Sequence, residues 1–286
     1  MAVDKDLLKI EQEIIGDIFT TGESMKVLRE LCDDIGHRFG GSESERAGAE
    51  FLKSKMIEYG LANVNIEEFS LASWERGPAS LHLTSPVQRD YTCVAMPYSC
   101  AADLEAELID VGEGELADYE RLKDLIPGRI VVTAAETNKP GERKSHRIVK
   151  FNWAVEYGAA GVVFINQNPG LLHITGALFG YTKIQNPAED WESPIPGVGV
   201  SWEAGQSILR LIERSNGEGT LHLKTENRTF ASTSRNVVGE IVGSEFPDEV
   251  VLIGGHFDGH DIAQGAGDDG AGTVTGLEAG RALAKY

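Results

Sequence analysis

An apolar run that leads directly into a histidine and an aspartate is the feature that most constrains how this chain folds. Val250–Ile253 is a short continuous apolar run, typical of a buried strand, and Gly254–Asp258 (Gly-Gly-His-Phe-Asp) follows it at once. A glycine-rich turn, Gly265–Gly272, then presents two more carboxylates before an expected helix. Because α/β enzymes place their sites at the carboxyl ends of strands, the pattern predicts an α/β fold with a polar site around His256.

The residue types around His256 are those that zinc takes as ligands. Asp258 follows two residues later and is placed to orient the imidazole, as the partner of a metal-bound histidine usually does. Asp268 follows twelve positions after His256, which is enough for a loop to bring its carboxylate back beside the ring. A carboxylate can bridge two ions about 3.5–4 Å apart. The alternative is a hydrogen-bonded surface histidine, with Asp269 as a helix cap.

The same turn has the spacing of a nucleotide-binding motif, since Gly265–Gly270 fits G-x-G-x-x-G. In dinucleotide-binding proteins this motif follows its strand directly. Here a mostly polar stretch of eight residues, Asp258 to Gly265, separates the two. Two carboxylates would also face the anionic phosphates, so the turn favours a cation over a nucleotide.

Composition excludes several classes of partner. The formal net charge of −19 argues against nucleic acid, because phosphate contacts need clustered cations. No apolar run reaches the length of a transmembrane helix, and the charged stretch Met1–Asp6 is not a signal peptide. We therefore expect a cytoplasmic protein, with a secreted protein whose leader has been removed as the alternative. Cys32, Cys93 and Cys100 fit free thiols better than a disulfide or a metal pattern.

The order of expected elements indicates a domain that is opened by an inserted one. Apolar residues from Leu7 to Ile18 recur at helical spacing, and Thr20 with Glu23 and Ser42 with Glu45 fit capping boxes, the second opening a helix that stops at Gly60. We expect strands near 64–66, 81–83, 128–132, 161–166, 195–201 and 221–223, and helices at 154–157 and 203–214. After these, 237–243 and 250–253 have the pattern of adjacent strands.

The histidine motif resembles the first metal-binding motif of the M28 zinc peptidases. That resemblance rests on Gly255–Asp258 with Gly265–Gly272, and Gly36–Ser42 matches the same family. The middle of the chain, with Gly128–Val132, Tyr157–Asn166 and Ile195–Ser201, resembles a protease-associated (PA) domain. Trp74–Gly77 and Gln264–Ala266 are similar to the carboxypeptidase Q branch.

The resemblance implies both a fold and a site. The fold is α/β, a zinc-exopeptidase-like mixed sheet flanked by helices, with residues 1–86 and 229–286 in the peptidase domain and 87–228 in an inserted β-rich PA domain. His256 would bind one zinc ion and Asp268 would bridge two. Asp258 would support the histidine, and the peptide bond between Asp268 and Asp269 would be cis.

The resemblance is incomplete in one respect. The family requires a Glu-Glu pair, whose first member is the general base, then a later aspartate and a final histidine. None of these follows before Tyr286, and Glu278, the only glutamate after Asp268, is expected in a salt bridge or in solvent. We therefore expect a C-terminally truncated exopeptidase, an aminopeptidase or dipeptidase, that lacks its general base. Such a fragment would be inactive and would hold zinc weakly or not at all.

Two other functions stay open at this point. One is a non-catalytic PA-type protein that binds peptides or other proteins, with a vestigial loop from His256 to Asp268. The other is a metal hydrolase of another acyl substrate, such as an aminoacylase. The partner expected for the peptidase is a peptide or dipeptide, and a homodimer stays open.

Overall fold

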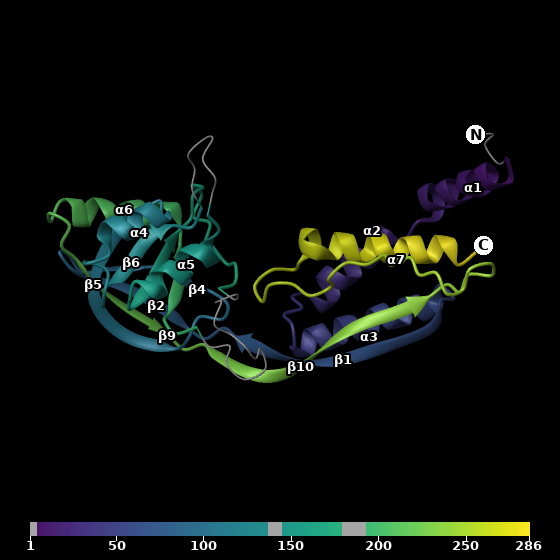
Figure 1. Ribbon diagram of the computed structural model, residues 1–286, viewed down its shortest axis with the longest axis horizontal. Coiled ribbons are helices and arrows are strands. Elements are labelled where there is room, and N and C mark those ends of the chain that lie inside the picture. The colour runs from purple at the N-terminus through teal and green to yellow at the C-terminus, as the bar shows by residue number, and fades with distance from the viewer. Residues whose placement is uncertain (1–4, 137–144, 179–192) are drawn as a thin grey trace. The chain divides into compact units, whose positions relative to one another are not determined.

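The chain folds into two compact units. The computed structural model describes residues 5–136, 145–178 and 193–286 (Figure 1). Unit 1 comprises Met1–Ser73 and Ala231–Tyr286, and unit 2 comprises Trp74–Phe230. Unit 1 is therefore discontinuous in sequence, and unit 2 is one continuous insertion.

Unit 1 consists of helices and a two-stranded ribbon. Its elements are α1 (Lys5–Thr21), α2 (Ser24–Arg29), the π-helix η1 (Glu30–Ile35), α3 (Glu43–Glu58), β1 (Ala62–Glu75), β10 (Arg228–Glu240), the π-helical turn η2 (Ala266–Gly270) and α7 (Ala271–Leu283). The strands β1 and β10, each of which crosses a unit boundary, pair with one another, and α3 lies along the ribbon that they form (Figure 1). The core joins α2, α3 and α7 through Val27, Leu52 and Leu277, with Phe257 among them.

The two expected capping boxes have different outcomes. Ser42 caps α3, because its hydroxyl accepts a hydrogen bond from the Glu45 amide at 3.1 Å. The box at Thr20 is wrong, since α1 continues to Thr21 and Thr20 lies inside it. Its hydroxyl donates to the Gly16 carbonyl oxygen, a bond that keeps it within the helix instead of at a new start.

The expected strand at Val250–Ile253 is also wrong. Residues 241–265 form neither helix nor strand, and Val250, Val251 and Leu252 are 84%, 88% and 91% exposed. A strand exists only where a neighbour supplies the ladder of hydrogen bonds. In the described part of unit 1 the ribbon pairs only β1 with β10, so the run has β-forming residues without a partner.

Unit 2 is built on an eight-stranded mixed sheet with the order β3-β2-β9-β5-β6-β7-β8-β4. The strands are β2 (Ala79–Ser85), β3 (Arg89–Tyr91), β4 (Cys93–Ala95), β5 (Ala102–Gly112), β6 (Ile130–Ala134), β7 (Gly161–Ile165), β8 (Gly197–Val200) and β9 (Thr220–Thr225). The central strands β5 to β8 are parallel, and the outer pairings are antiparallel. The helices are α4 (Leu116–Leu122), α5 (Arg147–Glu156) and α6 (Trp202–Glu213). The α/β fold with a mixed sheet is thereby confirmed.

Each face of this sheet has its own core, because successive side chains of a strand point to opposite faces. On β6, Ile130 and Val132 pack into the cluster that includes Ile208 of α6. Val131 between them packs into the cluster that includes Phe151 of α5 and Tyr119 of α4. The helices therefore cover both faces, which explains why the central strands β6 and β7 are mostly apolar.

The limits of the units differ from those expected for the domains. The strand β2, which begins at Ala79, pairs with β9 inside unit 2, so this unit begins before residue 87. The domain limits at 86/87 and 228/229 stay predictions. Cys32, Cys93 and Cys100, all within the described ranges, form no disulfide bond. No helix among the described residues is both long and apolar enough to cross a membrane.

Candidate metal centre

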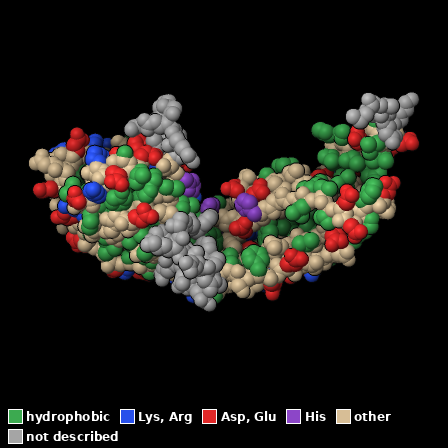
Figure 2. Space-filling view, viewed as in Figure 1, with side chains coloured by type: hydrophobic (Ala, Val, Ile, Leu, Met, Phe, Trp, Pro, Cys, Tyr) green, Lys and Arg blue, Asp and Glu red, His purple; other side chains and the backbone are tan. Residues whose placement is uncertain are grey.

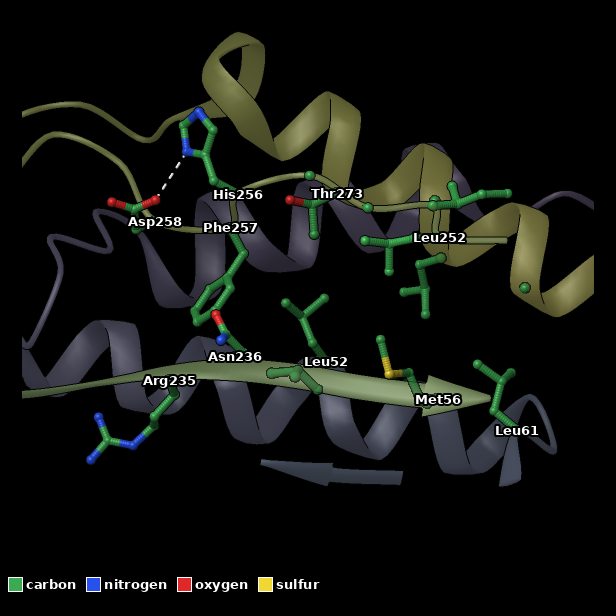
Figure 3. Close-up of a pocket in the computed structure, with 18 of the residues that line it drawn as sticks. Leu52, Met56, Leu61, Arg235, Asn236, Leu252, His256, Phe257, Asp258 and Thr273 are labelled. Carbon is green, nitrogen blue, oxygen red and sulfur yellow. Dashed lines mark hydrogen bonds and ion pairs between the residues drawn. The ribbon is translucent and has the colours of Figure 1, made fainter. Parts of the chain in front are cut away.

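The segment after the exposed apolar run places His256 between two carboxylates. Its Nδ1 lies 2.9 Å from Asp258 Oδ1, and its Nε2 lies 3.0 Å from Asp268 Oδ1. In Figure 3 the imidazole and the Phe257 ring point to opposite sides of the backbone. Phe257 enters the core of unit 1, and His256 is half-exposed. Burial of the phenylalanine therefore fixes the side on which the histidine is presented.

The two aspartates determine the charge state of the imidazole. Burial by itself would lower the pKa of His256, but the hydrogen bond and negative charge of Asp258, and then those of Asp268, outweigh it. The pKa of His256 is therefore raised above its ordinary value. A site that favours a positive charge on the ring by such means also favours a cation bound beside it.

The donor atoms present fit zinc in type. Imidazole nitrogen and carboxylate oxygen both bind zinc at about 2.0–2.2 Å, and His256 Nε2 and Asp268 Oδ1, 3.0 Å apart, are close enough to share one ion. Nowhere in the described ranges do three or more histidine, cysteine, aspartate or glutamate side chains gather as a metal-binding group. Catalytic zinc sites use three protein ligands, so His256 and Asp268 by themselves are too few donors for such a site.

Asp269 turns toward the start of α7. Its Oδ1 accepts a hydrogen bond from the Gly272 amide at 3.0 Å, which is the capping role that the sequence left open for it. The Asp268–Asp269 peptide bond is cis, and both residues have non-helical backbone angles. A Cβ atom at Gly272 would lie 2.3 Å from Asp269 Oδ1, so this close approach requires glycine.

Glu278 lies in a buried ion pair. Its Oε1 is 2.7 Å from Arg281 Nη2, and the same guanidinium nitrogen is 2.7 Å from Asp17 Oδ2 on α1. The other carboxylate oxygen of Glu278, Oε2, accepts a hydrogen bond from the Glu23 amide at 3.1 Å. The salt bridge expected from sequence is confirmed, and Glu278 joins α7 to the N-terminal helices.

A cavity of about 900 Å³ within unit 1 adjoins the histidine. Apolar residues from α3 and from the exposed run line it, with His256 and Asp258 among the lining residues. Figure 3 shows Leu52, Met56 and Leu252 around it. The sequence did not predict this cavity, because its walls come from segments that are far apart in the chain.

Two regions of the chain match the sequence profiles of known families. Residues 236–286 match the sequence profile of Peptidase family M28, and residues 97–208 match that of the PA domain. The C-terminal segment of the chain is therefore similar to M28 peptidases, and the middle of the chain is similar to a PA domain. The M28 match includes His256, Asp258, Asp268 and Asp269.

Curated relatives include carboxypeptidases and aminopeptidases of this family. Carboxypeptidase Q of Mus musculus is 29% identical over 256 residues, which cover 87% of this chain and 52% of the mouse protein. Leucine aminopeptidase 2 of Trichophyton equinum is 25% identical, with 94% of this chain and 49% of the fungal protein covered. The chain therefore spans about half the length of the curated relatives that it matches.

Solved structures share the fold. An M28 peptidase precursor from Shewanella amazonensis aligns with a TM-score of 0.77 at 24% identity, covering 97% of this chain and 63% of its own. BSAP, a zinc aminopeptidase from Bacillus subtilis, aligns with a TM-score of 0.65 at 24% identity, covering 92% and 57%. At this level of identity the likeness supports the fold alone.

Proposed function

We propose that this chain contributes part of the active site of a two-zinc exopeptidase, an aminopeptidase or dipeptidase that hydrolyses peptide bonds. The observation that carries the proposal is the His256 imidazole, with Asp268 3.0 Å from Nε2 and Asp258 2.9 Å from Nδ1. The relatives named as carboxypeptidase Q and leucine aminopeptidase 2 support the choice of reaction.

Each residue of the trio has a separate role in the proposal. Asp258 accepts a hydrogen bond from Nδ1–H of the neutral imidazole, which leaves the lone pair on Nε2 for a metal ion. Asp268 supplies a carboxylate that can bridge two ions and offsets their charge. Zinc, when bound, acts as a Lewis acid and lowers the pKa of a bound water. The peptide substrate and the second ion need further groups from the whole protein.

The proton transfer of peptide hydrolysis needs a general base. Glu278 is not offered for this role, because its carboxylate is held by Arg281 in a buried ion pair. We propose that the base and the remaining ligands come from sequence that the relatives have in addition to the half that this chain spans. The chain by itself is then inactive and binds zinc weakly.

Metal titration tests the first part of the proposal. Calorimetry with zinc should detect one weak site per chain, and H256A and D268N should weaken it by about tenfold or more. The matched control is H82A, since His82 is also paired with an aspartate, Asp90, at 2.6 Å. Equal affinities of H256A, H82A and the unmodified chain would contradict the proposed ligands.

An activity assay tests the second part. Purified chain with added zinc should not hydrolyse dipeptides or amino-acid anilides. Turnover that is lost in H256A and kept in H82A would show that the chain is a complete enzyme, and would refute its proposed incompleteness.

A non-catalytic role in peptide binding is the second candidate. Unit 2 favours it, because the unit has two cores of its own and includes the whole PA match at residues 97–208. Calorimetry of unit 2 with short peptides, compared with the same titration of the entire chain, tests this role. Equal binding in both would support it, and binding that depends on His256 would favour the peptidase.

A further inference from the structure

Arg38 is a fully buried cation next to the segment from His256 to Asp268, which is called the metal loop below. It lies in the turn between η1 and α3 and is 0% exposed. Burial lowers the pKa of its guanidinium from the ordinary value. The negative charge of Asp258 is one of the effects that oppose this lowering. An arginine remains charged in such surroundings, so its environment has to replace the water that a cation loses on burial.

Main-chain carbonyl oxygens provide that replacement. Within its own segment, Arg38 Nη1 donates to Leu31 at 3.1 Å and to Gly36. The other three acceptors come from the metal loop, more than 200 residues later in the chain. Nε donates to Phe257 at 2.6 Å, Nη1 to Gln264 at 2.9 Å and Nη2 to Gly265 at 3.2 Å.

These contacts enclose the residues that face the histidine. The carbonyl oxygen of Arg38 itself accepts a hydrogen bond from the Gly259 amide at 2.9 Å. Arg38 therefore binds the residue before and the residue after Asp258. Its contacts at 264–265 hold the backbone directly before η2, which carries Asp268.

The neighbouring glycines make room for this side chain. Gly265 has a φ of +63°, and a Cβ atom there would lie 2.9 Å from Arg38 Nη2. On α3, a Cβ atom at Gly48 would lie 3.0 Å from Arg38 Cδ. The space between α3 and the loop thus fits the arginine stem and its planar donor group, whose five N–H groups no other side chain supplies.

We propose that Arg38 is a positioning residue, which holds the loop 257–265 so that Asp258 and Asp268 both face His256. The holding of the loop rests on the contacts of Arg38 alone. Its consequence for metal binding rests in addition on the proposed function.

Hydrogen exchange of the full chain tests the holding of the loop. R38M removes the donors and keeps the stem, and should speed exchange of amides in 257–270 at least tenfold. R38K keeps the positive charge but lacks the planar guanidinium group, and it should give an intermediate effect. R281M is the matched control, because Arg281 is also buried in unit 1 but pairs with Glu278 and Asp17. Unchanged exchange in R38M, or equal acceleration in R281M, would overturn the proposal.

Cobalt spectroscopy tests the consequence for the metal. The visible absorption of bound Co²⁺ reports ligand geometry, which loss of general stability would not change. R38M should weaken Co²⁺ binding by about 10–100-fold and alter the spectrum, R38K should restore part of both, and R281M should match the unmodified chain. An unmodified chain that takes up no cobalt would contradict the weak metal binding proposed for this chain, and the exchange experiment would still decide the role of Arg38. If R38M does not fold, R38K and G48A, which crowds Arg38 Cδ, provide the same comparison.

Discussion

Glu45 shows that one residue can satisfy a sequence pattern and still act elsewhere. The capping box predicts that its carboxylate returns to the start of α3. Instead, Oε1 accepts hydrogen bonds from the Ser234 hydroxyl and the Arg235 amide, both at 3.0 Å, and Oε2 lies 3.0 Å from Arg235 Nη1. Glu45 is fully buried, and it joins the start of α3 to β10. Half of the box was therefore predictable, because the hydroxyl of Ser42 acts locally and the carboxylate of Glu45 acts at long range.

The titration of Glu45 gives a prediction with a definite sign. Burial raises the pKa of this carboxyl, and the hydrogen bonds and charge of Ser234 and Arg235 only partly offset the effect. The folded state then binds the proton more tightly than the unfolded state does. The contribution of Glu45 to stability is fully present below the ordinary pKa near 4.5 and is lost as the pH rises through the raised value. E45Q should remove this dependence when unfolding by urea is followed against pH.

E43Q is the control, two residues earlier on α3. Its hydrogen bond with Arg46 lowers the pKa of Glu43. The stability that it contributes is present above the ordinary pKa and is lost as the pH falls through the lowered value. The difference in unfolding free energy between each variant and the unmodified chain should therefore change with pH in opposite directions for E45Q and E43Q. Parallel curves for E45Q and the unmodified chain would contradict the role given to burial.

At the scale of elements, strands with neighbours were predictable and the strand without one was not. The β6 and β7 strands were predicted near 128–132 and 161–166, because parallel strands that are covered on both faces read as short, nearly continuous apolar runs. Val250–Ile253 has the same composition, yet it is exposed and forms no strand. Composition predicts which residues can form a strand, and pairing determines whether they do.

The candidate site was predictable in part, for a related reason. His256, Asp258 and Asp268 lie within thirteen consecutive residues, so a single loop brings them together. Arg38 belongs to Gly36–Ser42, a segment that the sequence singled out only by resemblance. Its contacts with residues 257–265 span more than 200 positions, and no local pattern encodes such a separation.

The exposed apolar run predicts self-association of the chain. Figure 2 shows hydrophobic side chains at the surface of unit 1, and an unpaired apolar segment is a template for intermolecular pairing. L252K, at a side chain that is 91% exposed, should lower binding of a hydrophobic dye and shift sedimentation toward monomer. The control is L125K, at a half-exposed leucine of unit 2. An L252K chain that sediments like the unmodified one would contradict this prediction.

At the scale of the whole molecule, the two units differ in whether one continuous segment of the chain forms the unit. Unit 2 is continuous in sequence and contains the eight-stranded sheet with a core on either face. Unit 1 brings together its two segments through the core of Val27, Leu52 and Phe257 and through the contacts of Arg38.

Residues 74–230 should fold when they are expressed alone. We expect cooperative thermal unfolding by circular dichroism, and L223A, at a leucine that is fully buried, should lower the free energy of unfolding by about 2–5 kcal/mol. In the entire chain, R281M should lower the melting temperature of unit 1 and leave that of unit 2 unchanged. An excised segment that melts gradually, or that L223A leaves unchanged, would show that unit 2 depends on the rest of the chain.

The discontinuity of unit 1 also sets an order of events during synthesis. Arg38 leaves the ribosome long before Phe257, to whose carbonyl oxygen its Nε donates, and the whole of unit 2 is made in the interval. At 5–20 residues per second this interval lasts roughly 11–44 s, which is far longer than a single domain of this kind needs to fold. Unit 2 can therefore be complete while the guanidinium of Arg38 is still in water, and residues 257–265 can reach Arg38 only after unit 2 has been made.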